Sequence, residues 1–205
     1  MTSHSDAVVL IGPMGAGKTS IGKKAARALG LPFFDTDAAV VRDHGPIEQL
    51  FIEHGEARFR AAERAAVREG LATGGIVSLG GGAIMDPDTR AELSQLRVVL
   101  LTVSPRVVAG RVRDSNRPLL QGGDDAIERW TAIFEERRPV YEELADVTFD
   151  TSTGPLQDVV DALVAWVRGD SLPQSDDAAA GSAGPSEISP HDSGPLEKEQ
   201  TPCEY

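Results

Sequence analysis

Short apolar runs alternate along the chain with longer stretches of helical periodicity. The runs are only three to six residues long and are rich in β-branched or aromatic side chains, a pattern typical of buried parallel strands. They occupy residues 7–11, 32–34, 76–79, 98–103 and 147–149. The pattern therefore predicts five buried strands.

Helical patterns separate these strands. Two of them open with Asp-Pro or Ser-Pro, which places a capping side chain before a proline at the first helical position. The predicted helices cover residues 18–29, 56–71, 86–96, 104–113 and 155–168. Strands that alternate with such helices indicate βαβ units with right-handed crossovers, so we expect an α/β fold whose ligands bind at the carboxyl ends of the strands.

The end of the chain has a different composition. Residues 171–205 contain five prolines but only three large aliphatic side chains, too few to offset the entropy lost on ordering. They carry seven acids and one base, which is half of the net charge of −12 of the whole chain. The sequence predicts one folded domain over residues 1–170 and a disordered acidic tail over residues 171–205.

Charge and composition also bear on partners and compartment. A negative chain is repelled by nucleic acid and by anionic membrane surfaces, so we expect neither as a partner. No apolar run approaches about 18 residues and no basic leader opens the chain, which predicts a cytoplasmic protein. With one cysteine, Cys203, and four scattered histidines, a metal would need oxygen ligands. No heptad pattern argues for an oligomer, so a monomer is expected.

Residues 12–19, GPMGAGKT, follow the first strand and open the first helix. They match the phosphate-loop pattern G-x-x-x-x-G-K-[ST] in both letters and context. Lys18 would reach the β- and γ-phosphates of ATP, and the Thr19 hydroxyl would bind Mg²⁺. The alternative, a glycine-rich turn that binds nothing, does not explain the lysine and threonine. The predicted nucleotide-binding residues here are Gly12, Gly15, Ala16, Gly17, Lys18, Thr19 and Ser20.

Two carboxylates follow the second strand. If the chain is still extended there, Asp35 and Asp37 project from the same face about 7 Å apart. One would then serve the metal while the other meets a substrate hydroxyl. The alternative is that the acid pair only caps the next helix, and the motif alone leaves both interpretations open.

Two further features lie near predicted strand ends. Three glycines, residues 80–82, directly follow a strand, which lets a ligand approach the backbone closely. Arg60 lies within the helix predicted over residues 56–71. For this arginine taken alone, a solvated surface position is the favoured interpretation.

Two more arginines lie in and beyond a polar segment. Residues 114–125 are rich in Asn, Gly and Asp, and Arg117 within them is typical of a lid that closes over a transferring phosphate. In the helix that follows, Pro139 predicts a break that would turn Arg137 inward.

In this order, GPMGAGKTS, DTD, FR, GGG, RPLL and R-x-P-x-Y resemble the shikimate kinases of the nucleoside-monophosphate-kinase-like P-loop group, over about residues 7–168. The resemblance implies a three-layer fold, with a five-stranded parallel sheet flanked by helices and covered by a lid. It also implies transfer of the γ-phosphate of ATP to the 3-hydroxyl of shikimate, on the pathway to chorismate and the aromatic amino acids.

The resemblance further implies roles for single residues in the acceptor site. Asp37 would contact the shikimate hydroxyls and act as the base. Arg60 and Arg137 would hold the carboxylate, and Gly81 and Gly82 would line the pocket.

On the nucleotide side, the resemblance places Arg117 at the γ-phosphate with Lys18 and Arg113 beside the adenine. Mg²⁺ would bind Thr19 directly and Asp35 through water. The chain departs from many relatives at Thr153, where they carry an adenine-side arginine.

Two alternatives remain. A related sugar kinase, such as a gluconate kinase, would share the phosphate loop but would not be expected to combine the DTD, GGG and R-x-P-x-Y motifs. A non-catalytic ATP-binding module would be favoured by loss of Lys18, Asp37 or Arg117, all of which are present.

Overall fold

The computed structural model describes residues 7–113 and 124–170, with the backbone alone for residues 111–113 and 124–125. The tail predicted over residues 171–205 and most of the predicted lid lie outside the described residues. Within the described part of the chain, no helix has the length and apolar character needed to span a bilayer.

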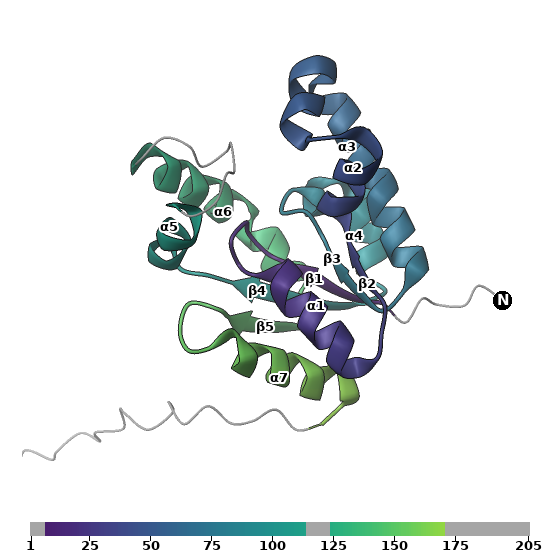
Figure 1. Cartoon of the computed structure of the whole chain (residues 1–205), viewed down its shortest axis with the longest axis vertical. Helices are drawn as coiled ribbons and strands as arrows, with labels where there is room; N and C mark the ends of the chain where they lie inside the picture. The colour runs from purple at the N-terminus through teal and green to yellow at the C-terminus, as the bar shows by residue number, and fades with distance from the viewer. Residues whose placement is uncertain (1–6, 114–123, 171–205) are drawn as a thin grey trace, which may run out of the picture. The chain divides into compact units, whose positions relative to one another are not determined.

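Five parallel strands form one sheet in the order β2-β3-β1-β4-β5 (Figure 1). The central strand β1 pairs with β3 on one side and β4 on the other, which places Val8 opposite both Ile76 and Arg97. All five predicted strands are confirmed within one residue at either end, but the prediction that all are buried is wrong. Strands β1 and β3 are buried throughout, whereas the edge strands are more open: β2 is half-buried and β5 alternates between half-buried and exposed residues. Their bounds are Val8–Ile11 for β1, Phe33–Asp35 for β2, Ile76–Ser78 for β3, Arg97–Thr102 for β4 and Val147–Asp150 for β5.

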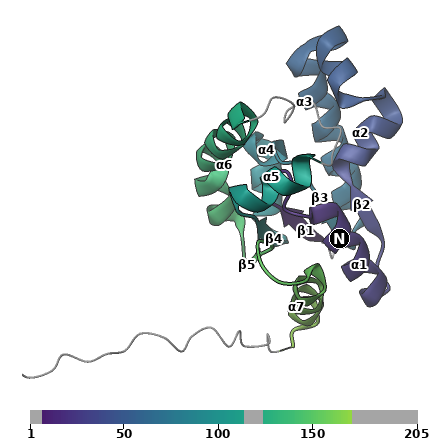
Figure 2. The same ribbon diagram turned by 60° about the vertical axis from the view of Figure 1, so that its left-hand side comes forward.

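Helices cover both faces of the sheet and make the predicted three layers (Figures 1 and 2). Alternate strand residues point to opposite faces. Val8 and Leu10 of β1 pack into the cluster that contains α1 and α7, whereas Val9 and Ile11 pack into the cluster that contains α3 and α4. The helices are α1 (Lys18–Leu29), α2 (Thr36–His44), α3 (Ile47–Thr73), α4 (Pro87–Leu93), α5 (Pro105–Arg113), α6 (Asp124–Leu144) and α7 (Leu156–Arg168), with a short 3₁₀ helix η1 (Ala83–Met85).

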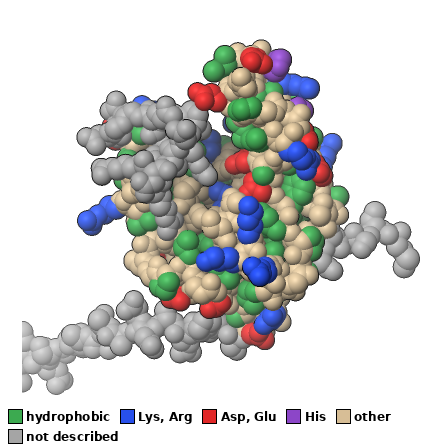
Figure 3. Space-filling model, in the orientation of Figure 1, with side chains coloured by type: hydrophobic (Ala, Val, Ile, Leu, Met, Phe, Trp, Pro, Cys, Tyr) green, Lys and Arg blue, Asp and Glu red, His purple; other side chains and the backbone are tan. Residues whose placement is uncertain are grey.

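Helix α2 and the first part of α3 form an arm with a small core of its own, to which Val40, Leu50 and Phe59 contribute. Helix α3 starts earlier than predicted, and Gly55, with φ 75°, interrupts its helical conformation. Figure 3 shows hydrophobic side chains on the surface of this arm. Ile52 is the most exposed of them, at 77%.

The predicted helix over residues 86–96 is shorter than expected. Asp86 caps α4 by accepting a hydrogen bond from the Thr89 N–H, as the Asp-Pro pattern predicted. The helix ends at Leu93 because β4 already begins at Arg97. Propensity alone does not reveal this tertiary constraint.

Candidate active site

The phosphate loop joins the end of β1 to the start of α1, as predicted. Gly12 has φ 133° and lies against the carbonyl of Leu101 in the neighbouring strand, so a side chain there would collide with that oxygen. Gly15 and Gly17 have φ 85° and 86°, in the left-handed region that glycine adopts at little cost. The shape of the loop therefore depends on these three glycines.

Two side chains brace this loop. Lys18 Nζ donates to the carbonyl oxygens of Gly12 at 2.8 Å and Pro13 at 3.0 Å. From α6, Trp130 donates its indole N–H to the carbonyl of Met14 at 2.9 Å. Helix α1 has no side-chain cap and no acid of its own in its first turn, which leaves the positive end of its dipole suited to an anion. This arrangement suits a bound phosphate.

Thr19 and Asp35, the two predicted magnesium ligands, lie together. The Thr19 hydroxyl donates to Asp35 Oδ2 at 2.7 Å. The other carboxylate oxygen, Asp35 Oδ1, accepts from the Ala38 N–H at 3.0 Å and so caps α2. A hydroxyl and a carboxylate beside a phosphate loop are the oxygen donors that Mg²⁺ shares with nucleotide phosphates. The donor set therefore fits the ion.

The assumption of an extended chain from Asp35 to Asp37 is wrong. Helix α2 begins at Thr36, so Asp37 lies in its first turn, and the cap is Asp35. The Asp37 carboxylate lies against Gly80, where an added Cβ would be 2.5 Å from Asp37 Oδ1 and 3.0 Å from Glu63 Oε1. The buried Thr36 hydroxyl accepts from the Gly80 N–H at 2.9 Å and fixes the start of α2 to the glycine loop, residues 80–82.

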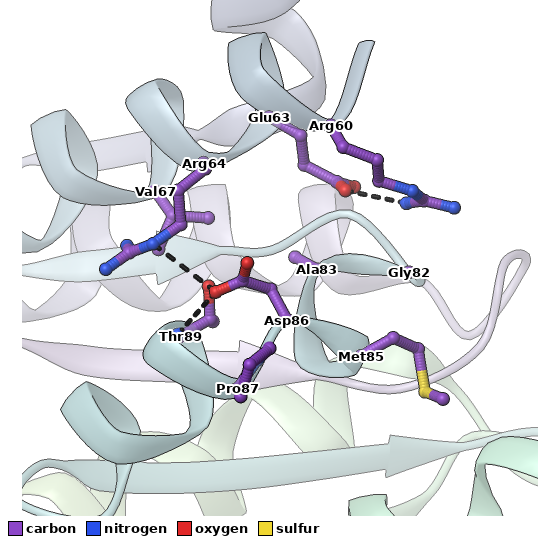
Figure 4. A pocket seen from close by; sticks show the side chains of 10 residues that line it. All are labelled: Arg60, Glu63, Arg64, Val67, Gly82, Ala83, Met85, Asp86, Pro87 and Thr89. Atoms are coloured by element: carbon purple, nitrogen blue, oxygen red, sulfur yellow. Dashed lines mark hydrogen bonds and ion pairs between the residues drawn. The ribbon is translucent and has the colours of Figure 1, made fainter. Parts of the chain in front are cut away.

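Arg60 is half-buried: its side chain is 38% exposed and pairs with two carboxylates, so the solvated position favoured for it alone describes only part of its surroundings. Its Nη1 donates to Glu63 Oε2 at 2.7 Å (Figure 4). Its guanidinium also donates to the Glu56 carboxylate. The Glu63 side chain is only 7% exposed, and burial raises its pKa although Arg60 acts in the opposite direction. A Cβ on Gly82 would lie 2.8 Å from Arg60 Nη1, so the guanidinium lies directly on the glycine loop.

A cavity of about 280 Å³ opens beside these residues. Arg60 and Glu63 line one side of it, and Gly82 lines another (Figure 4). Arg64 also lines the cavity and donates twice to the Glu92 carboxylate, at 3.0 and 2.6 Å, which ties α3 to α4. The cavity extends from Arg60 and Gly82 toward Asp86 and Thr89, and the residues that line it do not include Asp37 or Arg137.

Arg137 approaches the glycine loop from α6. Its Nη1 donates to the carbonyl of Gly81 at 3.1 Å, and the hydroxyl of Tyr141 donates to the same oxygen at 2.6 Å. Pro139 lies inside α6 and does not end the helix. The predicted inward arginine is thus at the loop, and it reaches the loop from a helix that continues beyond the proline.

Two of the predicted nucleotide contacts, Arg113 and Arg117, lie partly or wholly outside the described residues. Arg117 lies outside the described residues, and only the backbone of Arg113, the last residue of α5, is described. Ser20 is exposed in the first turn of α1, and Thr153 is exposed in the loop before α7. The adenine side therefore stays a prediction.

Sequence reasoning gave no role to Thr36, Glu63 and Tyr141, although all three contact the glycine loop. Glu63 follows Arg60 by three residues, a helical spacing that pairs opposite charges and could have indicated their ion pair. Tyr141 is the last residue of the R-x-P-x-Y motif, although the motif alone gives its side chain no role. Nothing in the sequence connects Thr36 with Gly80, because their contact depends on the pairing of β2 with β3.

The chain is similar to known shikimate kinases in sequence. A family model described as shikimate kinase matches residues 14–168. The shikimate kinase of Thermobifida fusca is 48% identical over 147 residues, which cover 70% of this chain and 84% of that protein. The shikimate kinase of Rhodococcus jostii is 43% identical over 162 residues, which cover 77% of this chain and 95% of that protein.

Solved structures of shikimate kinases are also similar to this chain in fold. A shikimate kinase from Acinetobacter baumannii, in complex with shikimate, superposes with a TM-score of 0.74 at 32% identity and covers 80% of this chain and 94% of its own. A gluconokinase from Sinorhizobium meliloti superposes with a TM-score of 0.54 at 22% identity, over 81% of this chain and 93% of its own, and shares the fold alone. The family model, the sequence identity and the fold agree, and the chain belongs to the shikimate kinase family.

Proposed function

We propose that the chain transfers the γ-phosphate of ATP to the 3-hydroxyl of shikimate and releases ADP and shikimate 3-phosphate. The observation that carries this proposal is the convergence of Arg60, Arg137 and Asp37 on the glycine loop. Paired guanidinium groups suit a carboxylate, and a nearby carboxylate suits a hydroxyl. Shikimate offers both groups on one small ring.

In this proposal the acceptor oxygen forms a bond to the γ-phosphorus while the bond between that phosphorus and its bridging oxygen to the β-phosphate breaks. Asp37 takes the hydroxyl proton and orients the oxygen. Phosphoryl transfer through a loose transition state depends mainly on positioning and on stabilisation of charge. Arg60 and Arg137 position the acceptor, while Lys18 and the amides of the phosphate loop bind the phosphates.

Thr19 and Asp35 would hold Mg²⁺. Bound there with the nucleotide, the ion would supply positive charge that offsets the charge developing on the phosphates. Contacts of Arg113 and Arg117 with the nucleotide remain predictions, as do the cytoplasmic location and the monomeric state.

A coupled assay of ADP release tests the proposal. Purified protein is supplied with ATP and Mg²⁺ and either shikimate, gluconate or no acceptor. We expect turnover with shikimate alone. Turnover with gluconate instead would identify a sugar kinase, and ATP binding without turnover on any acceptor would identify a non-catalytic module.

Replacing Arg60 or Arg137 with Lys should raise the KM for shikimate about 10- to 30-fold while the KM for ATP changes little. Lysine keeps the positive charge but loses the planar fork that binds both oxygens of a carboxylate, an interaction worth roughly 1.5–2 kcal/mol. Steady-state kinetics with each substrate varied in turn gives both constants.

Neighbouring arginines supply matched controls for this experiment. Arg58 is exposed on the same helix as Arg60, and Arg138 follows Arg137 and pairs with Glu142 at the surface. Arg58→Lys and Arg138→Lys should leave both constants unchanged. Equal increases in the two KM values for Arg60→Lys or Arg137→Lys would remove that arginine from the acceptor site.

Deleting residues 171–205 should leave both KM values and kcat within about twofold of the full chain. All the described site residues lie between Gly12 and Tyr141, and the segment deleted has too few apolar side chains to pack. Kinetics and thermal unfolding of the truncated chain provide the measurement. A fall in activity of about tenfold or more in a truncated chain that still folds would make the tail part of the enzyme.

A further inference from the structure

The carbonyl oxygen of Gly81 accepts hydrogen bonds from two side chains of one helix. The hydroxyl of Tyr141 donates at 2.6 Å and Nη1 of Arg137 donates at 3.1 Å. These side chains are one helical turn apart on α6, so both reach the loop from the same face. Tyr141 is 1% exposed, so its bond to Gly81 is shielded from water.

The backbone N–H groups from Gly80 to Ala83 differ in whether they have a hydrogen-bond partner. The Gly80 N–H donates to the Thr36 hydroxyl, and the Ala83 N–H donates to the Gly80 carbonyl. Across residues 7–113 and 124–170, by contrast, neither the Gly81 N–H nor the Gly82 N–H donates to a protein acceptor. Two donor groups therefore remain available to a ligand in the middle of the loop.

Two guanidinium groups lie beside these amides, while the carboxylates of Asp37 and Glu63 face the neighbouring Gly80. Arg60 lies against Gly82, and Arg137 is bonded to Gly81. Because the peptide between Gly81 and Gly82 receives two donors at its oxygen, its N–H is polarised toward stronger donation. An anion with two oxygens that binds here would find guanidinium and amide donors together.

Tyr141 is better suited than Arg137 to fix this peptide. Its ring stacks near Phe134, with ring centroids 6.4 Å apart, and its side chain has only two rotatable bonds. Burial raises the pKa of Tyr141 to about 12, so the phenol keeps its proton and stays a donor throughout the neutral range. Arg137 is thereby left to contact the ligand with its remaining N–H groups.

We propose that Tyr141 is a positioning residue of the acceptor site, which acts through the Gly81 carbonyl to hold Arg137 and the Gly81–Gly82 amides in place for the acceptor carboxylate. The inference rests on the proposed kinase function and assigns Tyr141 to the binding of the carboxylate. It gives Tyr141 no part in the transfer of phosphate.

Tyr141→Phe tests this role, because it removes the hydroxyl and keeps the ring. We expect the KM for shikimate to rise about 5- to 10-fold, as loss of one buried hydrogen bond implies, with the KM for ATP and kcat within about twofold. Loss of folded enzyme lowers kcat alone, so the two KM values stay informative even if the variant is less stable. An unchanged KM for shikimate, or an equal rise for ATP, would overturn the proposal.

Phe134→Leu serves as the structural control. It disturbs the same aromatic packing and leaves both bonds to Gly81 in place, so it should lower the melting temperature without raising the KM for shikimate. A rise in that KM equal to the rise in Tyr141→Phe would show that packing, and not the hydrogen bond, sets the affinity. Activity of the parent chain on shikimate is measured first, so failure of the proposed function is seen separately.

A double-mutant cycle with Arg137→Lys gives an independent readout. If Tyr141 acts by holding Arg137 and the loop, the effects of the two changes on the KM for shikimate should overlap. The double variant would then show an increase smaller than the product of the two single increases. Increases that multiply would mean that Tyr141 acts without Arg137, contrary to the proposal.

Discussion

Asp37→Asn is expected to lower turnover about 10²–10⁴-fold, the range typical of general-base catalysis. Asparagine keeps the shape of the side chain and one acceptor oxygen, but it lacks the charge that would take the hydroxyl proton. The nucleotide should still bind, because its contacts come from the loop at residues 12–19. Nucleotide titration and the coupled assay on one preparation separate the two effects.

The fold itself should tolerate this substitution. The cap of α2 is Asp35, so Asp37→Asn removes no capping bond. Its interaction with the dipole of α2 is worth only about 0.3–1 kcal/mol. Asp43→Asn is the matched control, because Asp43 lies exposed on the same helix and pairs with Arg42 at the surface. Turnover of Asp37→Asn within about threefold of the parent would exclude Asp37 as the base.

Gly80→Ala is expected to lower kcat/KM for shikimate by about 10²-fold or more, since a misplacement of about 1 Å is enough for such a loss. The new Cβ would lie 2.5 Å from Asp37 Oδ1 and 3.0 Å from Glu63 Oε1, so both carboxylates must move. The change should leave nucleotide affinity intact. Steady-state kinetics and nucleotide titration provide the measurements.

The control for this experiment is Gly110→Ala in α5. An added Cβ there meets no atom within 4 Å among the described residues, and alanine favours a helix over glycine. This variant should keep its activity and melt no lower than the parent. If Gly80→Ala behaves in the same way, Asp37 is not held against the loop in the working enzyme.

Much of the fold is predictable from local pattern. The run at residues 98–103 predicted a strand that is buried over most of its length, whereas the run at 147–149 forms an edge strand whose residues alternate between half-buried and exposed. The phosphate loop fixed the connection from β1 to α1. The ends of helices and strands are harder to predict, because they depend on which elements pack beside them in the fold. Helix α4 stops early to allow β4 to start at Arg97, and α3 extends past Gly55 into an arm that packs on α2.

The candidate site was predictable in its parts but not in their arrangement. The motifs named Asp37 and Arg60, yet the chain between Asp35 and Asp37, assumed to be extended for one interpretation, already starts a helix, and Arg60 is paired with Glu63. The Asp37 carboxylate lies against Gly80, a contact between elements that the motif does not contain. The pair of Arg60 and Glu63, in contrast, lies within one helix at a spacing that does indicate it. Contacts between elements carry the information that a linear pattern lacks.

The bond between Trp130 and the carbonyl of Met14 gives the enzyme a built-in optical probe. The chain has two tryptophans, and Trp166 lies over Arg97 near the end of α7, away from the phosphate loop. Trp166→Phe would leave one indole, buried and bonded to the loop that holds the nucleotide. The emission of that indole would report ATP binding without any added dye.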